Sequence, residues 1–282
     1  VRIAIHAMLE RGLEPEFPEA VHRQLSSLRH PAREEGPHIR DLTALPWCSI
    51  DNDDSRDLDQ LTVIEPLPKG AVRVMVAVAD VDALVKPGTP IDDHARYNTT
   101  SVYTSARVFH MLPERLCTDL TSLNLDEDRL ALVTEMSFSD DGILTGSSIF
   151  RARVRNKAQL AYDAVSAWIE GEADLPEAAL GMAGMATQLR MQDELAQKLR
   201  VLRHAQGSLE FESFQPKALF EGDHITDIRQ QQHNRGRQLI EEFMIATNGC
   251  TARFLSAQGC GALRRAVRSP ERWQRIIEVA QG

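Results

Sequence analysis

The acidic stretch from Ser49 to Gln60 constrains this chain more than any other feature, because five of its twelve residues are aspartates. They are Asp51, Asp53, Asp54, Asp57 and Asp59. Apolar residues on both sides predict a loop held at the ends of buried strands. Carboxylates this close together repel one another and cost stability unless a cation lies among them. The stretch, called the acidic loop below, therefore predicts a metal site.

The spacing of the aspartates favours magnesium over calcium. Asp57 and Asp59 are two residues apart and would share one face of an extended segment, with Asp51 entering from the preceding strand. A calcium loop that began at Asp51 would need glycine where Arg56 stands and glutamate where Thr62 stands. Magnesium needs only a few carboxylates, with waters and a substrate phosphate oxygen. The loop alone also leaves open a solvated turn between two strands.

Further motifs accompany the acidic loop in the order and spacing of a known family. They are Val74 to Val81, Ser101-Val102-Tyr103, Met111-Leu112-Pro113-Glu114, Ser122-Leu123 and Glu241-Glu242. With the acidic loop, and from about Asp41 to about Arg268, they resemble the catalytic domain of the ribonuclease II family. Each motif alone is weak, and the combination is specific.

The resemblance implies magnesium binding by Asp51, Asp57 and Asp59, with manganese as a possible substitute. It makes Asp57 and Asp59 catalytic, and Asp59 the more important of the two. Two magnesium ions would activate a water and neutralise charge on the transition state of phosphodiester hydrolysis. Gln60 is also a candidate ligand, but it stands where the family most often has a fourth aspartate and brings no negative charge. We therefore expect weaker or more selective metal binding.

The resemblance also implies four RNA-binding residues. Tyr103 would pack against the terminal nucleotides, Phe211 would stack on the 3′-terminal base, and Tyr162 would lie near the RNA path. Glu241 would contact the last ribose. Aromatic stacking suits a protein that grips any sequence, because every base has a π-face. Core packing is the alternative for the three aromatic residues, and a surface ion pair, with Arg237 as partner, is the alternative for Glu241.

Composition indicates an ordinary globular protein of 282 residues, with 43% hydrophobic and 26% charged residues. The chain contains no run of eighteen apolar residues and no signal-peptide pattern, so we expect a cytoplasmic protein without a membrane anchor. The four cysteines are widely spaced and form no CxxC pair, which argues against a zinc site or a disulfide framework.

The net charge of −9 argues against broad electrostatic capture of nucleic acid. A local positive lining would suffice for an enzyme that threads RNA. Four basic residues, called the basic strip below, alternate along a predicted strand and would project to one side. They are Arg151, Arg153, Arg155 and Lys157. A solvated strand face is an equally good interpretation of the basic strip.

The pattern of strands followed by helices predicts an α+β domain over residues 41–282, with a mixed β-sheet core surrounded by helices. Strands are expected at 72–81, 101–104, 130–138 and 143–150. Helices are expected at 159–170, 177–204 and 235–257. Asp80 would cap the first of these strands or lie in a turn. Residues 1–40 form a short helical N-terminal segment, with helices at 2–11 and 18–28 and a linker at 29–37.

The family domain continues into a Thr-Ser-Pro-Ile-Arg-Arg-type segment, which supplies a catalytic arginine, and then into an S1 RNA-binding barrel. Neither is in this sequence. We therefore expect the fold to be incomplete at its C-terminus and the chain to be the first part of a longer protein.

The resemblance predicts a magnesium-dependent hydrolytic exoribonuclease that degrades single-stranded RNA from the 3′ end. Processivity and release of nucleoside 5′-monophosphates also come from the resemblance. Single-stranded RNA is the expected partner, without a membrane or an obligate protein partner. A catalytically impaired RNA-binding protein of the same fold is the main alternative, because of Gln60 and the missing arginine segment. A metal-dependent phosphohydrolase of small substrates is a third hypothesis.

Overall fold

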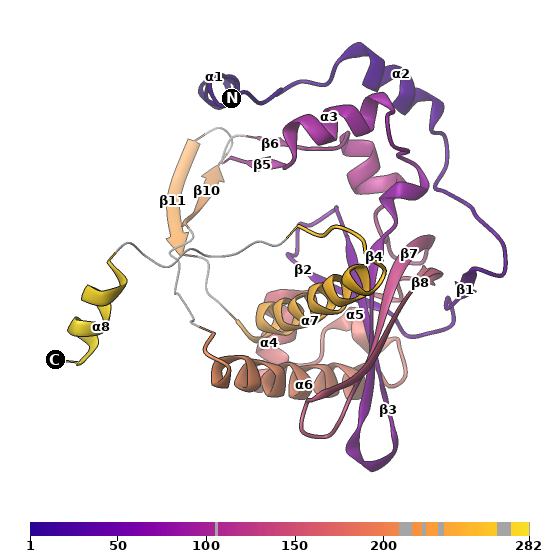
Figure 1. The fold of residues 1–282 in the computed structure, drawn as a ribbon, viewed down its shortest axis with the longest axis vertical. Coiled ribbons are helices and arrows are strands. Elements are labelled where there is room, and N and C mark those ends of the chain that lie inside the picture. The colour runs from indigo at the N-terminus through magenta and orange to yellow at the C-terminus, as the bar shows by residue number, and fades with distance from the viewer. Residues whose placement is uncertain (105–106, 209–215, 222–223, 231–233, 264–271, 282) are drawn as a thin grey trace.

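The computed structural model describes residues 1–104, 107–208, 216–221, 224–230, 234–263 and 272–281 (Figure 1). A seven-stranded mixed sheet is the centre of the described structure. In spatial order its strands are β1 (Ile39–Asp41), β8 (Leu144–Arg155), β7 (Asp128–Phe138), β4 (Val72–Ala79), β3 (Gln60–Pro66), β2 (Cys48–Asp51) and β9 (Ala158–Ala161). β1 pairs with β8 and β2 pairs with β9 in parallel, and the other pairs are antiparallel. The expected mixed sheet is therefore confirmed.

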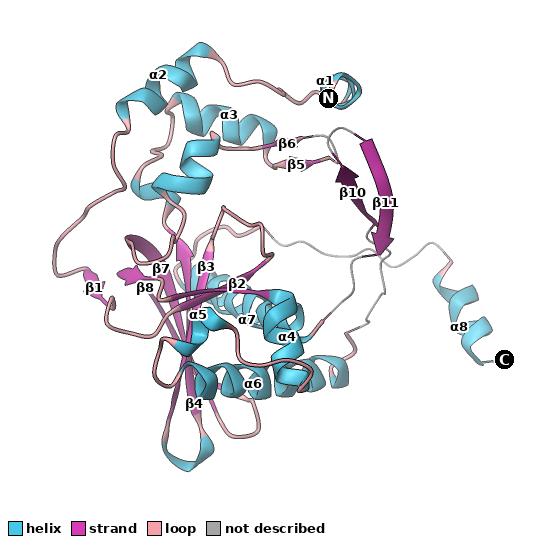
Figure 2. Ribbon diagram, turned by 180° about the vertical axis from the view of Figure 1, so that it is seen from behind, coloured by secondary structure: helices cyan, strands magenta, loops and turns pink. Residues whose placement is uncertain are grey.

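Four helices cover one face of the sheet (Figure 2). They are α4 (Tyr162–Glu170), α5 (Glu177–Leu180), α6 (Met185–Ala205) and α7 (Arg235–Ala257). Ile64 and Val74 of the sheet pack with Leu189 of α6 and Phe243 of α7, and all four are buried. The alternate residues of β3, Leu61 and others, belong to a second cluster on the opposite face. Both faces are thus covered, which explains the apolar sequence on each side of the acidic loop.

A third, smaller core joins the N-terminal segment to the rest of the molecule. α1 (Arg2–Glu10) and α2 (Glu19–Ser27) are the two expected helices. Val21 of α2 packs with Ile91 of α3 (Pro90–Asn98), and the Ile91 amide donates a 2.8 Å hydrogen bond to Gln24. Figure 1 shows this layer on one side of the sheet. Residues 29–37 contain neither helix nor strand, and their role as a linker stays a prediction.

The remaining elements are short or lie outside the sheet. They are η1 (Pro68–Gly70), η2 (Val81–Ala83), η3 (Leu116–Leu120), β5 (Val102–Tyr103), β6 (Val108–Phe109), β10 (Pro216–Glu221), β11 (His224–Gln230) and α8 (Trp273–Gln281). Across the described residues, every helix is too short or too polar to cross a membrane.

Two helix predictions were wrong in part. The helix expected at 159–170 begins only at Tyr162, because residues 158–161 pair in parallel with β2 and alternate between buried and exposed positions. The single helix expected at 177–204 is broken into α5 and α6. The break contains Gly181 and Gly184, and Gly184 precedes α6 with a φ of +82°, a left-handed conformation that favours glycine. The 235–257 helix has its expected bounds.

Candidate active site

The acidic loop connects β2 to β3, as expected. β2 ends at Asp51 and β3 begins at Gln60. Asp53 and Asp54 form an exposed turn, which agrees with a solvated role for both. Leu58 is buried, and its neighbours are more accessible, so the loop runs in an extended form that presents Asp57 and Asp59 together.

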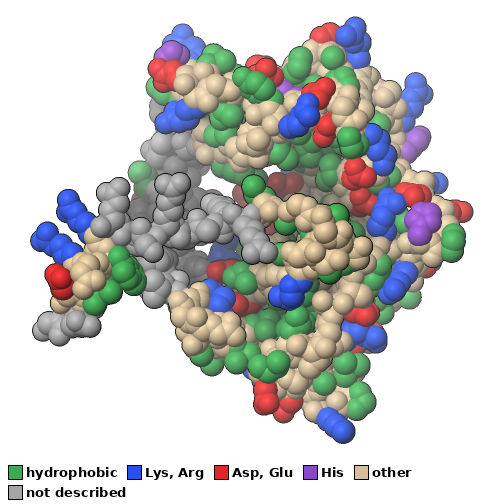
Figure 3. All heavy atoms as spheres, in the orientation of Figure 1, with side chains coloured by type: hydrophobic (Ala, Val, Ile, Leu, Met, Phe, Trp, Pro, Cys, Tyr) green, Lys and Arg blue, Asp and Glu red, His purple; other side chains and the backbone are tan. Residues whose placement is uncertain are grey.

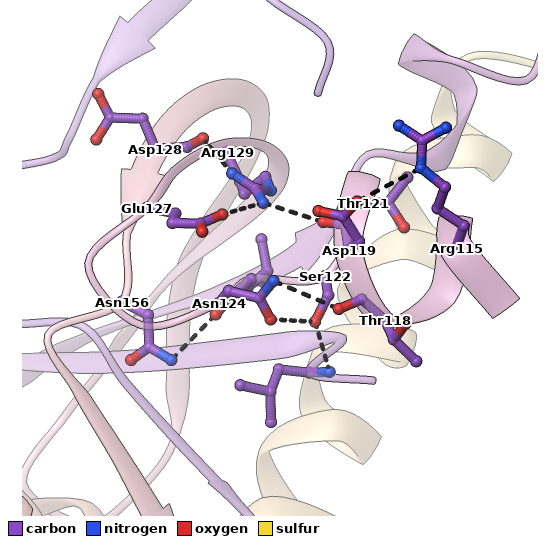
Figure 4. Close-up of polar contacts among 12 residues, drawn as sticks. Arg115, Thr118, Asp119, Thr121, Ser122, Asn124, Glu127, Asp128, Arg129 and Asn156 are labelled. Carbon is purple, nitrogen blue, oxygen red and sulfur yellow. Dashed lines mark hydrogen bonds and ion pairs between the residues drawn. The ribbon is translucent and has the colours of Figure 1, made fainter. Parts of the chain in front are cut away.

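Ser122 and Leu123, which follow η3, hold this part of the loop by hydrogen bonds and are called the clamp below. The Leu58 amide donates to Ser122 Oγ at 3.0 Å, and the Leu123 amide donates to the Leu58 carbonyl at 2.8 Å. Asn156 in turn donates to the Leu123 carbonyl and to Ser49 Oγ, both at 3.0 Å. Figure 4 shows Ser122 and Asn156 within this network. The Ser122-Leu123 motif therefore fixes the backbone between the two aspartates.

Burial and neighbouring negative charge raise the pKa values of two aspartates of the loop, Asp59 and Asp51. Desolvation, followed by the charges of Asp51 and Asp57, raises the pKa of Asp59 to about 6, although part of its side chain reaches solvent. Burial also raises the pKa of Asp51, and Asp57 adds to that effect, whereas hydrogen bonds from Asn52 and Ser55 oppose it. These directions describe a concentration of negative charge that a cation would relieve.

Two of the predicted aromatic residues lie in the same electrostatic field. The Tyr103 side chain is 71% exposed, and the pKa of its hydroxyl is raised by desolvation and then by Asp57, Asp59 and Asp51, among other groups. Burial, then Asp51, raises the pKa of Tyr162 to about 12. Both tyrosines are therefore subject to the charge of the acidic loop, Tyr103 from the end of β5 and Tyr162 from the start of α4. Phe211 lies outside the described residues.

The two glutamates of α7 have different environments. Glu242 is buried, and both of its oxygens accept hydrogen bonds from Arg203. Glu241 is exposed, and its Oε1 lies 4.0 Å from Arg203 Nη2. The alternative of a Glu241 pair with Arg237 is wrong in its partner, because Arg237 turns toward the acidic loop instead. A ribose contact by Glu241 stays a prediction.

Gln60 is buried, and its Nε2 donates to the Ile50 carbonyl at 3.3 Å. This bond crosses from β3 to β2 and engages the amide nitrogen within the sheet. A metal contact would fall to its carbonyl oxygen, and that role stays a prediction.

The three arginines of the basic strip are ion-paired, which favours the strand-face interpretation over an open lining for RNA. Arg151 contacts Glu34 and Asp80, both at 2.7 Å. Arg153 contacts Asp41 at 2.5 Å, and Arg155 contacts Asp128 at 2.6 Å. Figure 3 shows acidic and basic side chains intermingled on the flank that carries β1.

Asp80 has the structural role expected of a residue at a strand end. Its carboxylate accepts a hydrogen bond from the Ala83 amide at 3.2 Å at the start of η2, and it pairs with Arg151.

A cavity of about 580 Å³ beside the basic strip is lined by residues 31–35 and 127–130 with Arg153 and Arg155. These lining residues come from the linker, from β7 and the residue before it, and from β8, and the acidic loop contributes none of them.

The sequence interpretation missed a contact between Asn52 of the acidic loop and Arg237 of α7. Arg237 Nη2 donates to Asn52 Oδ1 at 2.7 Å, and the Arg237 guanidinium carbon lies 4.5 Å from the centroid of the Tyr162 ring. Asn52 and Arg237 are 185 residues apart, so no local pattern could have paired them.

The donor set suits a metal that is only partly enclosed by protein. Within the described residues, no three His, Cys, Asp or Glu side chains converge closely enough to hold an ion by themselves. Magnesium is commonly bound by one or two carboxylates, with waters and substrate oxygens completing its shell. The acidic loop offers Asp51, Asp57 and Asp59 as carboxylate donors for an open site of that kind.

Comparison with known proteins identifies the family. The family model for the RNB domain matches residues 39–280. The chain is 39% identical over 241 residues to Ribonuclease R of Escherichia coli strain K12, covering 85% of this chain and 29% of that protein. It is 32% identical over 253 residues to Exoribonuclease 2 of Escherichia coli O1:K1 / APEC, covering 88% of this chain and 37% of the relative.

A solved structure has the same fold. It is Mycoplasma genitalium RNase R in complex with ribose methylated single-stranded RNA, with a TM-score of 0.88 and 25% identity over 99% of this chain and 44% of that chain. The chain therefore belongs to the RNB domain family, and the predicted family and fold class are confirmed. It spans about a third of the length of the two curated relatives above.

Proposed function

We propose that the protein is a magnesium-dependent hydrolytic exoribonuclease that degrades single-stranded RNA processively from the 3′ end and releases nucleoside 5′-monophosphates. The observation that carries the proposal is the acidic loop, where burial and neighbouring carboxylates raise the pKa values of Asp51 and Asp59 beside an exposed tyrosine. The names of the relatives and the RNA bound to the structural neighbour support the same class of substrate.

Each residue has a distinct task in this proposal. Asp51, Asp57 and Asp59 would hold magnesium, which supplies an activated water and neutralises charge on the scissile phosphate. Manganese could replace it. The exposed ring of Tyr103 offers a stacking surface for a terminal base. Tyr162 and Glu241 would lie along the RNA, with Phe211 as a further stacking residue.

We further propose that residues 41–282 belong to the catalytic domain, that residues 1–40 are a helical attachment to it, and that the enzyme acts in the cytoplasm. The packing of α2 against α3 supports an attachment held by a small core of its own.

The test is degradation of a 5′-labelled single-stranded RNA by the full-length protein, with and without magnesium. We expect full-length RNA to be converted to a short labelled product, without intermediates of other lengths, only when magnesium is present. Asp59→Asn should abolish the conversion. Asp53→Asn is the matched control, because Asp53 is exposed in the turn of the same loop, and it should retain activity.

Other outcomes would refute parts of the proposal. Immediate release of labelled mononucleotide would mean the opposite direction of degradation, and a ladder of intermediates would mean a distributive enzyme. Intact RNA that still binds the wild-type protein would favour the catalytically impaired RNA-binding protein instead. Hydrolysis of nucleotides but not of RNA would favour a phosphohydrolase.

A further inference from the structure

The acidic loop is tied to the start of α7 by a continuous series of hydrogen bonds. Arg237 Nη2 donates to Asn52 Oδ1 at 2.7 Å. The side-chain nitrogen of Asn52 faces the Oδ1 atom of Asp51 at 3.4 Å, and its backbone amide donates to the same oxygen at 2.6 Å. An amide has distinct donor and acceptor ends, so the arginine on its oxygen turns its nitrogen toward the aspartate.

The start of α7 is itself held by neighbouring elements. Asn234 caps the helix by accepting from the Arg237 amide at 3.0 Å, and it donates to Asp163 of α4 at 2.6 Å. Arg235 binds both carboxylate oxygens of Asp193 on α6. Arg237 therefore starts from a backbone whose position is set by α4 and α6.

A glycine allows the close approach that brings Arg237 over Tyr162. A Cβ atom on Gly236 would lie 2.7 Å from the Tyr162 carbonyl oxygen, and the Gly236 amide donates to Ser166 Oγ at 2.8 Å. The helix ends can thus touch only because this position has no side chain. The Arg237 guanidinium then lies over the Tyr162 ring, an arrangement in which cation–π attraction adds to the hydrogen bond.

The hydrogen bond of the Arg237 side chain points to the acidic loop rather than to α7 itself. Its Nε atom is buried and has no hydrogen-bond partner among the described residues, while Nη2 is directed to the loop. A guanidinium whose only purpose was to stabilise α7 would be expected to satisfy its donors within the helix layer.

We propose that Arg237 and Asn52 are positioning residues of the acidic loop, which fix the orientation of the Asp51 carboxylate for metal binding. The inference rests on the proposed function and adds to it two residues that act through Asp51. Residues that hydrogen-bond to a metal ligand fix its orientation, and losing one typically costs about 10–100-fold in metal affinity or activity.

The test is a double-mutant cycle in the full-length protein, with kcat and KM for single-stranded RNA measured at saturating magnesium. Arg237→Met and Asn52→Ala should each lower kcat by about 10–100-fold and change KM less. The double variant should be no worse than the single variants, because both interrupt one chain of contacts. Asn52→Asp keeps an acceptor for Arg237 but removes the donor toward Asp51, so it should be as defective as Asn52→Ala.

Arg190→Met is the matched control, because Arg190 also lies over an aromatic ring, that of Trp168 at 4.4 Å, in a different pair of helices. It should leave kcat unchanged. If Arg237→Met does not fold, Arg237→Lys replaces it, and a lysine that can reach Asn52 without the planar stacking should give an intermediate kcat. An Asn52→Ala variant with wild-type kcat, or a double variant whose loss is the product of the single losses, would overturn the proposal.

A second measurement separates this inference from the proposed function. Binding of Mn²⁺ without RNA is followed by electron paramagnetic resonance, and Asn52→Ala should bind more weakly than the wild type. If the wild type does not degrade RNA, the proposed function fails, and the positioning role is then decided by this binding alone. Equal Mn²⁺ binding by the two proteins, or none by the wild type, would overturn it.

Discussion

Acidic side chains occur in two regions of this molecule with opposite electrostatic consequences. In the acidic loop, desolvation and neighbouring carboxylates raise the pKa of Asp59 to about 6. Beside the basic strip, a hydrogen bond from Arg151 holds the pKa of Glu34 at about 2, and bonds from Thr43 and Arg153 do the same for Asp41. The negative charges beside the basic strip are compensated by arginine, whereas those of the acidic loop repel one another and would be compensated by a bound cation.

Asp59→Asn should give the largest effect and should separate activity from stability. Loss of a direct ligand should lower RNA degradation by more than about 100-fold, because outer partners alone cost about 10–100-fold. The raised pKa means that the stability supplied by the Asp59 proton is present below pH 3.8 and is lost as pH rises through about 6. Without metal at pH 8, Asp59→Asn should therefore melt at a higher temperature than the wild type.

The two melting curves should converge near pH 4, where the wild-type carboxyl is largely protonated. A lower melting temperature for Asp59→Asn at pH 8 would mean that other groups already compensate the Asp59 charge in the metal-free protein. The acidic loop would then not differ from the basic strip in having uncompensated carboxylates.

Ser122→Ala should give the next largest effect, because it leaves the Leu58 amide without its 3.0 Å acceptor. The cost of an unsatisfied buried donor is about 1–3 kcal/mol in the free energy of unfolding, which urea denaturation measures. Activity should fall as well, since the clamp fixes the backbone between Asp57 and Asp59. Ser139→Ala is the control, because it removes a 3.2 Å acceptor from the amide of Ile143, which is exposed to water. Unchanged activity would show that the loop keeps its form without the clamp.

Magnesium should stabilise the wild-type protein in a pH-dependent way. A ligand at ten times its dissociation constant stabilises the folded state by about 1.4 kcal/mol. The increase in melting temperature should be larger at pH 8 than at pH 5, because protons compete with metal for Asp51 and Asp59, whose pKa values are raised. Asp53→Asn should respond like the wild type. An equal response at both pH values would place the metal elsewhere.

Glu34→Gln should give the smallest effect, a slight loss of stability at pH 7 that 1 M salt reduces. The pKa of Glu34 is lowered from 4.5 to about 2, so the stability of its ion pair is present above pH 4.5 and is lost as pH falls through 2. The difference from the wild type in urea denaturation should shrink over that range. A gain in stability would contradict the structural role assigned to the acidic partners of the basic strip.

Patterns of a few residues predicted much of the fold. Strand-forming apolar segments located β4 and β7, the apolar residues after the acidic loop located β3, and the 235–257 helix has its expected bounds. Short segments that pair with a distant strand were predicted less well. Residues 159–161 continue a helical pattern, but the backbone of β2 offers them hydrogen bonds that only the assembled sheet provides. Helix preference is a weak signal that such tertiary pairing overrides.

The sequence alone determined that Asp51, Asp57 and Asp59 lie together on one short loop, because neighbours in the chain cannot separate. It also determined the family to which that loop belongs. Tertiary structure decided which charges are compensated, since the basic strip meets Glu34 and Asp41 only after β1 joins β8. The meeting of Arg237 with Asn52 was likewise decided by the fold, because contacts between distant segments depend on how helices and strands pack rather than on local pattern.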